Sequence, residues 1–452
     1  MQEADNVRKI GSRLELFTDG WLIEGMQGLV QRLNNPVTRE VSMEWNMPWE
    51  GNTCAYVTVF EDGTKFRMYY RGSNYDWEKR KSTHQVACYA ESADGIHWER
   101  PDLGLFEFQG STHNNIVWTG PGNHNFAPFR DANPGAGPDA KYKALGGDSS
   151  GLIAFKSPDG IHWSTIRDEP VITEGAFDSQ NIAFWDGHRG VYMEYHRQSR
   201  DRIRDIMMST SEDFINWEDP VFLDFGETPM EHLYTNAVTP YFRAPHLLIG
   251  FPKRFLPHRK KVDEHPNPGI SEGVFMTSRD GVHWHRWQEA FIRPGVQRDR
   301  WWERCNMPSW GVLQTESSIP GTPDELSLYV NEKYYEEGDR LRRLTLRLDG
   351  FVSISADFKG GELTTKPLVF EGDGLVLNYS TSAAGGIMTE VQDREGSPIE
   401  GFEIEECEEL YGDEIDGRVR WKSGADLGDL SGSVVKLRFA LRDADLYSLR
   451  FG

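Results

Sequence analysis

Four short segments of the chain share one pattern: a serine, an aspartate two residues later, and a tryptophan six residues after the serine. They are SADGIHW at Ser92, SPDGIHW at Ser157, SEDFINW at Ser211 and SRDGVHW at Ser278. A recurrence of roughly 50–70 residues is typical of propellers and other repeat folds. The segments that precede them, such as KFRMYYRG and HQVACYAES, are rich in Tyr, Val and Phe, as β-strands are. The pattern therefore predicts a fold built from repeated antiparallel sheets.

The shared residues of these segments have a simple structural interpretation. An aspartate carboxylate can hold a tight turn, and the glycine that follows it adopts a positive φ without strain. The tryptophan then packs between neighbouring sheets, so each segment predicts a hairpin turn with an aromatic wedge. In the third copy Phe214 stands where the other copies have glycine. We interpret the four aspartates as turn formers rather than ligands or catalysts: Asp94, Asp159, Asp213 and Asp280.

Five further segments have the character of strand openings. They are WNMPWEGN at Trp45, NFAPFRD at Asn125, FDSQNIAFWD at Phe177, YTNAVTPYF at Tyr234 and CNMPSWGV at Cys305. In a propeller the innermost strand of each blade lines a central channel, so polar residues at five such openings converge on one pocket. Beyond about Leu341 the tryptophan turns stop, while alternating strands continue to the end of the chain.

Length and composition agree with this division. A chain of 452 residues exceeds what one hydrophobic core usually holds. Aromatic residues make up 12% of the chain, and its 45 glycines and 23 prolines are spread along it. The sequence thus predicts an all-β fold, with a five-bladed β-propeller over residues 1–340, including an N-terminal extension, and a β-sandwich over residues 341–452.

The charge of the chain limits its partners. A formal charge of −22 opposes binding to nucleic acid or to an anionic membrane surface, and it favours a neutral partner. No run approaches the roughly 20 apolar residues of a membrane-spanning helix. The first residues lack the apolar run of a secretory signal, which predicts a cytoplasmic protein, or a secreted or periplasmic one if a signal was trimmed. The oligomeric state stays open.

Cofactor chemistry has little support in the sequence. The four cysteines are scattered without metal-binding spacing, and no nucleotide-binding loop is present. We therefore predict no cofactor and no metal ligands, although a structural divalent ion in the channel is conceivable near His113 or His232.

Carboxylates at the five openings suggest glycoside hydrolysis. This reaction needs one carboxyl group that protonates the leaving oxygen and a second that attacks the sugar or activates water. The candidate catalytic residues are Glu50, Asp131, Asp178, Glu231 and Glu303. Each has a structural alternative, such as an ion pair between blades or a solvated rim position.

Arginine and aromatic side chains near the openings suit binding of sugar hydroxyls or anionic groups. The candidate substrate-binding residues are Trp49, Arg71, Arg130, Arg197, His232, Tyr234, Arg254 and Trp302. For the arginines, a salt bridge between blades is the alternative; for the tryptophans, it is packing between them.

The motif FRDANP resembles one in the glycoside hydrolase family of invertases, levanases and inulinases. The predicted architecture is also similar to that of the single-propeller enzymes that cleave arabinan and xylan side chains. In the invertase family an Arg-Asp-Pro motif in the second blade holds the Asp that grips sugar hydroxyls. Arg130 and Asp131 match it, with Ala132 in place of the proline.

Two other positions depart from the invertase pattern. The nucleophilic Asp of the first blade corresponds to Met47, which leaves Glu50 as the nearest substitute. Asp178 stands at the position of the acid Glu. The turn pattern, together with RPDLG, NNIV and LYTNAVTPYF, is also similar to bacterial proteins described as glycoside-hydrolase-like.

Three functions follow as hypotheses. The leading one is a glycosidase that removes terminal sugars at the channel mouth. A carbohydrate-binding propeller without activity is the second, because the first-blade Asp is missing. The third is a glycoside phosphorylase, which needs a cluster of Arg and His at the pocket.

Overall fold

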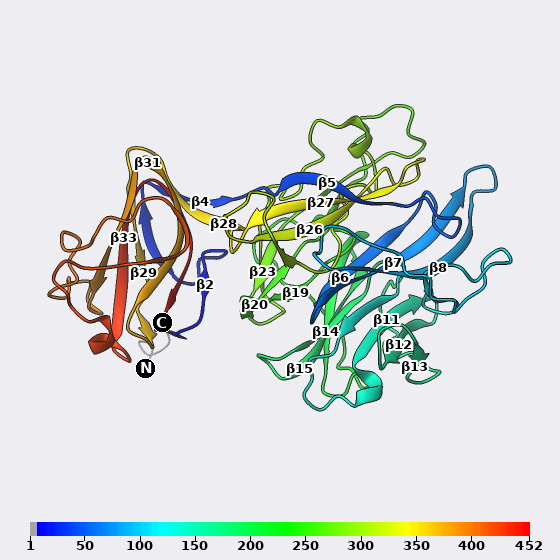
Figure 1. The fold of residues 1–452 in the computed structure, drawn as a ribbon, viewed down its shortest axis with the longest axis horizontal. Helices are drawn as coiled ribbons and strands as arrows, with labels where there is room; N and C mark the ends of the chain where they lie inside the picture. Colours follow the sequence, from blue (N-terminus) through cyan, green and yellow to red (C-terminus); the bar gives the residue numbers. More distant parts are fainter. Residues whose placement is uncertain (1–6) are drawn as a thin grey trace. The chain divides into compact units, whose positions relative to one another are not determined.

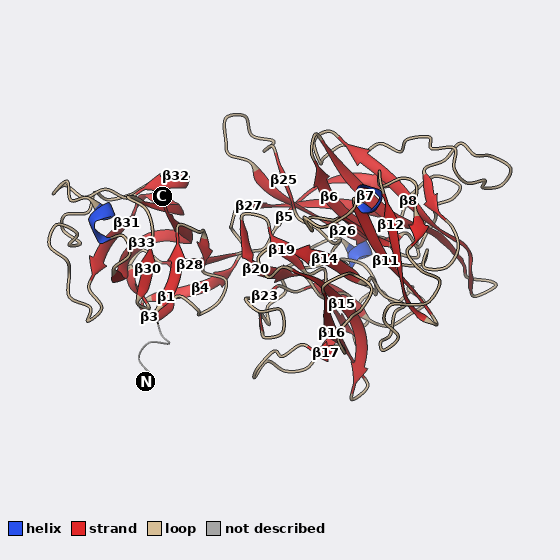
Figure 2. Ribbon diagram, turned by 90° about the horizontal axis from the view of Figure 1, so that it is seen from below, coloured by secondary structure: helices blue, strands red, loops and turns tan. Residues whose placement is uncertain are grey.

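The computed structural model describes residues 7–452, and regular structure in this range is almost entirely β-strand (Figures 1 and 2). The range contains no α-helix, only short 3-10 turns at Pro138–Ala140, Arg298–Arg300 and Leu427–Leu430. The prediction of an all-β fold is therefore confirmed. The first six residues of the predicted propeller domain lie outside the described range.

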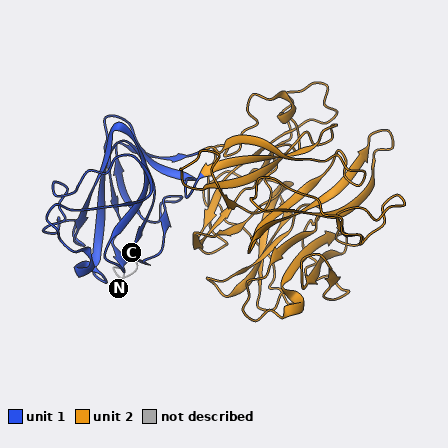
Figure 3. Cartoon of the chain, in the orientation of Figure 1, with its two compact units in different colours: residues 1–34, 347–452 blue, residues 35–346 orange. Residues whose placement is uncertain are grey.

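The chain divides into two compact units (Figure 3). The large unit comprises residues 35–346, and the small unit comprises residues 347–452 together with the N-terminal segment that ends at residue 34. The predicted placement of this N-terminal segment with the propeller is wrong, because its strands β3 and β4 pair with β29 and β28 of the small unit. The boundary between the two units lies after residue 346, not after the predicted residue 340, because strand β27 (Arg340–Arg347) belongs almost entirely to the large unit.

Within the described range, the large unit holds five four-stranded sheets, called here the first to fifth sheets. In this order they are β6–β9 (Ala55–Asp62, Lys65–Asp76, Lys81–Ser92, Ile116–Trp118), β10–β13 (Ala127–Arg130, Tyr142–Asp148, Gly151–Ser157, Ser164–Thr165), β14–β17 (Ile182–Asp186, Val191–Arg200, Ile203–Ser211, Val221–Phe222), β19, β20, β23 and β24 (Thr239–Tyr241, Ala244–Gly250, Met276–Ser278, Trp284–Arg286), and β25, β26, β27 and β5 (Leu313–Thr315, Glu325–Glu332, Arg340–Arg347, Val37–Glu44). A three-stranded sheet, β18, β21 and β22 (His232–Leu233, Lys253–Leu256, Ile270–Gly273), adjoins the fourth sheet in sequence.

The four repeated turns connect the third strand of a sheet to its outer strand. Strands β8, β12, β16 and β23 each end on the serine of one repeat. In the first repeat Asp94 Oδ1 accepts hydrogen bonds from the N–H groups of Ile96 and His97, both at 2.8 Å. The other three aspartates accept equivalent bonds, which confirms that they are turn formers. The fifth sheet needs no such turn because its outer strand, β5, comes from the other end of the unit.

Each turn also packs against the preceding sheet. Tyr69 of the first sheet donates to the carbonyl oxygen of Gly160, and Tyr195 of the third sheet donates to that of Gly281. A Cβ atom at Gly160 would lie 2.7 Å from the Tyr69 hydroxyl, which explains the glycine there. In the third repeat Phe214 instead packs against Phe129 of the second sheet, with ring centroids 5.6 Å apart.

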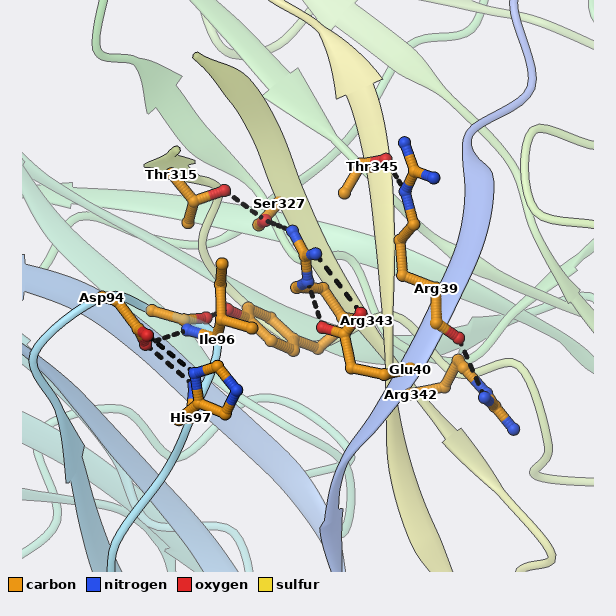
Figure 4. Close-up of polar contacts among 12 residues, drawn as sticks. Arg39, Glu40, Asp94, Ile96, His97, Thr315, Ser327, Arg342, Arg343 and Thr345 are labelled. Carbon is orange, nitrogen blue, oxygen red and sulfur yellow. Dashed lines mark hydrogen bonds and ion pairs between the residues drawn. The ribbon is translucent and has the colours of Figure 1, made fainter. Parts of the chain in front are cut away.

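Strand β5 is the first strand of the large unit, and β27 is the last. The two lie side by side and pair in antiparallel orientation (Figure 1). The side chain of Arg343 on β27 is 2% exposed and bonds to Glu40 of β5 and to Ser327 of β26 (Figure 4). It also bonds to Glu325 of β26. We call this β5–β27 pairing with the Arg343 contacts the clasp.

The small unit forms one ten-stranded sheet around its own core. Its strands are β1 (Arg8–Gly11), β2 (Glu15–Leu16), β3 (Ile23–Gln27), β4 (Leu29–Leu33), β28 (Val352–Ala356), β29 (Gly361–Thr365), β30 (Leu368–Phe370), β31 (Leu375–Gln392), β32 (Asp413–Arg418) and β33 (Val434–Phe451). Buried and partly exposed residues alternate along β33, and its buried side chains, such as Leu437 and Phe439, enter the core. The alternation visible in the sequence thus sets which face of β33 is buried.

Replacing Asp213 with alanine tests the role of the turns. Burial opposes ionisation, but hydrogen bonds from the N–H groups of Asn216 and Ile215 lower the pKa of Asp213 to about 2. The variant loses these bonds, so we expect its free energy of unfolding to fall by about 1 kcal/mol at neutral pH. The carboxylate stabilises the fold only when ionised, and the deficit therefore shrinks as the pH falls from 4 toward 2. Urea unfolding at pH 7 and pH 3 measures both effects, and an equal deficit at the two pH values would contradict this role.

Candidate active site

Two tyrosines and a main-chain oxygen connect three sheets of the large unit at the starts of their strands. The hydroxyl of Tyr56, at the start of β6, lies 2.9 Å from that of Tyr234, which follows β18. Both hydroxyls donate to the backbone oxygen of Asp178, which precedes β14, at 2.9 and 3.3 Å. The side chain of Asp178 is 71% exposed and pairs with Arg197 of β15. The structure thus brings together three predicted residues, Asp178, Arg197 and Tyr234.

Two arginines, Arg71 and Arg304, lie next to the tyrosines of this network. The Arg71 guanidinium lies 4.7 Å above the Tyr56 ring and donates to the Thr53 carbonyl oxygen and the Tyr334 hydroxyl, both at 2.7 Å. Arg304 also donates to the Tyr334 hydroxyl, at 3.3 Å. Arg71 was predicted to lie at the site, whereas Tyr56, Tyr334 and Arg304 were not.

Lys253 at the start of β21 contributes a buried amine. It is 2% exposed, and its Nζ lies 4.1 Å from the centroid of the Tyr234 ring. Burial and the charge of Arg304 lower the pKa of Lys253 well below its ordinary value. Although burial opposes ionisation of Tyr234, the nearby charges of Arg304, Arg197 and Arg71 lower its pKa below the ordinary value. The cationic surroundings therefore favour negative charge at this point.

A pocket of 610 Å³ lies beside the network. Asp178 and His124 are on its wall, together with Gln85, Asn123 and residues of the second sheet and of the loops before and after it: Gly120, Pro121, Gly122, Gly147, Asp148, Ser149, Gly151, Thr173, Gly175, Ala176 and Phe177. His124 Nδ1 lies 3.0 Å from Gln85 Oε1, and its Nε2 lies 3.3 Å from Arg71 Nη1. A hollow of equal volume in the small unit, beside Glu362 and Arg442, contains none of the predicted residues.

Aromatic rings lie next to the arginines. The rings of Tyr75, Trp77 and Tyr335 pack against one another with centroids 4.9 to 5.4 Å apart, and Trp77 is 37% exposed. Arg304 lies 5.2 Å from the Tyr335 ring, which connects these three rings to the network. We call them the aromatic wall. Partly exposed aromatic rings beside polar groups suit the stacking of sugars.

Glu303 is the second predicted carboxylate close to this network. Its Oε1 accepts a 2.6 Å hydrogen bond from Asn267, and its Oε2 lies 3.9 Å from Arg304 Nε. The adjacent Trp302 is buried, stacks on His265 and donates to the Tyr334 carbonyl oxygen, so it supports the site from below its surface.

The structure does not bring the other predicted carboxylates to the network. Glu50 is buried and accepts hydrogen bonds from Tyr70 and Arg100. Asp131 is buried against Lys143 and Tyr192. The predicted opening NFAPFRD does contain the start of β10 at Ala127, but Asp131 follows the last residue of this strand and lies at its other end.

Glu231 belongs to a separate group of ion pairs. It pairs with Arg254 and Arg286, and Arg254 pairs in turn with Glu272. The neighbouring His232 accepts a hydrogen bond from the N–H group of Arg204 at its Nδ1.

Two more predicted binding residues lie apart from the network. Arg130 is half exposed and lies 3.6 Å from Asp62. Trp49 donates to Asn115 and packs against the core of the first sheet.

Two structural findings concern metals and membranes. Residues 7–452 contain no group of three or more His, Cys, Asp or Glu side chains that could hold a metal ion. His113, considered for a divalent ion, instead pairs with Asp102. In the same range, no helix is long and apolar enough to cross a membrane.

The burial of His124 makes folding stability depend on pH. Burial and the charges of Arg71 and Arg304 lower the pKa of His124 to about 3, so the folded state resists protonation that the unfolded state accepts below pH 6.5. Stability therefore falls as the pH drops, by about 2–3 kcal/mol at pH 4.5 from this residue. In His124→Asn we expect the loss of stability between pH 7.5 and 4.5 to be smaller by this amount. Urea unfolding of both proteins measures it, and equal losses would contradict the assignment.

Comparisons with known proteins add the following findings. No protein-family model matches the chain. A stretch of 137 residues is 39% identical to an uncharacterized protein of Mycobacterium tuberculosis, and the match covers 29% of this chain and 41% of that protein. The chain thus spans less than half the length of the curated relatives it matches.

Solved structures with similar folds were also found. A glycoside hydrolase shares 13% identity at a TM-score of 0.46, covering 69% of this chain and 92% of its own. An N-acetylgalactosamine deacetylase from F. plautii shares 16% identity at a TM-score of 0.44, over 70% and 94% of the chains. A β-fructofuranosidase from Bombyx mori shares 13% identity at a TM-score of 0.43, over 93% and 94%.

Proposed function

We propose that the large unit is a five-bladed β-propeller and that the small unit is a β-sandwich. Five four-stranded sheets follow one another along the large unit, and β5 completes the last of them. The turn contacts form a series: Tyr329 of the fifth sheet donates to Gly95 of the first, and Tyr69 of the first donates to Gly160 of the second. A ring of sheets accounts for these contacts, because each blade then packs on the one before it.

We propose that the protein is a glycosidase that acts where the inner strands begin. The observation that carries this proposal is the exposed carboxylate of Asp178, connected through the tyrosine and arginine network to the region of Glu303. Two carboxyl groups on either side of a glycosidic bond supply the acid and the base or nucleophile. The pocket beside Asp178 suits a terminal sugar, and the aromatic wall suits the next one.

Sugar release from a panel of aryl glycosides and oligosaccharides tests this function. We expect the wild-type protein to release a monosaccharide from at least one of them. Glu303→Gln retains the size and hydrogen-bonding shape of the side chain, and we expect it to release the sugar at least 100-fold more slowly. Glu289→Gln, a substitution of an exposed glutamate outside the network, is the matched control. Saturable binding of a sugar without any release would instead favour a carbohydrate-binding propeller.

A further inference from the structure

The candidate active site carries an excess of positive charge. Five basic side chains gather around Tyr56, Tyr234 and Tyr334: Arg71, Arg197, Arg204, Lys253 and Arg304. Among the described residues, the only acidic side chains paired with them are Asp178, on Arg197, and Glu303, on Arg304. The whole chain has a formal charge of −22, so this local excess runs against its composition.

Two of these basic side chains, Arg71 and Lys253, are buried and make no ion pair with an acidic side chain among the described residues. Arg71 is 4% exposed, its Nε has no hydrogen-bond partner, and its other contacts are with neutral groups: the oxygens of Thr53 and Tyr334 and the ring of His124. The nearby His124 is neutral at physiological pH because burial lowers its pKa. For Lys253 Nζ, residues 7–452 provide the Tyr234 ring as a contact but no hydrogen bond or ion pair.

The other buried groups near these cations do not neutralise them. Asp339 makes no ion pair with Arg71 within the described residues, and burial raises its pKa well above the ordinary value, which favours the uncharged acid. The tyrosine rings give cation–π contacts, which stabilise a cation less than a hydrogen-bonded carboxylate does. Buried charges in proteins are normally paired, because an unpaired one loses its hydration without compensation.

We propose that this cluster is an oxyanion-binding subsite. A phosphate, sulfate or carboxylate group bound by Arg71, Lys253 and Arg304 supplies the negative charge that the protein does not provide there. Guanidinium groups and an amine match the oxygens of such groups, and the Tyr334 hydroxyl, which accepts from Arg71 and Arg304, adds a neutral donor. This inference depends on the proposed function in one respect, because it takes the ligand to be a carbohydrate. The oxyanion is then either a substituent of the sugar or free inorganic phosphate that accepts the glycosyl group.

Direct binding tests the subsite independently of catalysis. Calorimetry at low ionic strength compares inorganic phosphate, inorganic sulfate, methyl β-glucuronide and methyl β-glucoside. We expect at least one anion to bind at least tenfold more tightly than the neutral glucoside. Lys253→Met and Arg304→Gln should each weaken anion binding at least tenfold, whereas Lys260→Met, an exposed lysine of the loop after β21, should not change it. Melting temperatures identify a variant that fails to fold, and Arg304, which is 35% exposed, is the safer of the two sites.

The outcomes of these measurements distinguish a charged sugar from free phosphate as the source of the anion. They also test the subsite and the glycosidase function separately. Tighter binding of the glucuronide than of phosphate places the charge on the sugar. Tighter binding of phosphate, with sugar 1-phosphate formed from a cleaved glycoside, makes phosphate the acceptor. Anion binding without any cleavage overturns the glycosidase proposal but retains the subsite. Equal affinity for the neutral glucoside and the anions, or anion binding unchanged in both variants, overturns the subsite, whether or not sugars are released.

Discussion

Asp178→Asn is expected to lower kcat for sugar release about 10²–10⁴-fold, the usual contribution of an acid, base or nucleophilic carboxylate. The substitution removes the charge and retains the shape of the side chain. The link between Asp178 and the two tyrosines uses its backbone oxygen, so the amide leaves these hydrogen bonds in place. Because the side chain is 71% exposed, its ion pair with Arg197 adds little to stability, and the urea midpoint should not change.

The matched control is Asp139→Asn. Asp139 is also exposed and also pairs with a cation, Lys156, but it lies in the 3-10 turn before β11, away from the network. We expect this variant to retain wild-type kcat and KM. If Asp178→Asn kept most of the wild-type kcat, or lost activity only by raising KM, Asp178 would be a binding group and the chemistry would belong to other residues.

The four turn segments made most of the large unit predictable. Their serine, aspartate and glycine act locally, through hydrogen bonds within a few residues, so their role is visible in a single segment of sequence. The pairing of β3 and β4 with strands more than 300 residues away has no such local signal. For this reason the N-terminal segment was assigned to the wrong unit.

Only part of the site could be predicted from the sequence, because neighbouring residues on a strand point in opposite directions. Arg254 was selected as a binding residue, yet it faces Glu231 and Glu272, while its neighbour Lys253 faces Tyr234. In the turn that precedes β25, Glu303 was predicted and its neighbour Arg304 was not. The sequence shows polar residues at a strand opening, but the face that each occupies depends on local backbone geometry.

That geometry is unusual at the site. Tyr56, Arg304 and Tyr335 all have positive φ angles, of 54°, 64° and 77°, although none is glycine. Such conformations cost of order 1 kcal/mol or more, and they persist where the surrounding structure enforces them, often at functional sites. They also turn the following side chains in directions that strand alternation does not predict. Sequence patterns of glycine and asparagine, the usual signals of positive φ, are absent at these three positions.

The second large effect is expected at the clasp, where Arg343→Met should lower the free energy of unfolding by about 1–3 kcal/mol. Arg343 is 2% exposed and bonds to Glu40 of β5 and to Glu325 and Ser327 of β26. Methionine fills much of the same volume but leaves these acceptors without their buried donor. Because β5 and β27 come from opposite ends of the large unit, the loss weakens the contact that joins these ends.

Arg39→Met on the same sheet is the control for this prediction (Figure 4). Arg39 bonds to Thr345 and pairs with Glu325 at 3.4 Å, but it is 31% exposed, so its loss should cost less than about 1 kcal/mol. Urea unfolding followed by tryptophan fluorescence gives both values, provided that the slope of the transition is the same in all proteins. Similar small losses in the two variants would mean that the buried arginine contributes no more than a surface ion pair. The two ends of the large unit would then be held together by the β5–β27 backbone pairing alone.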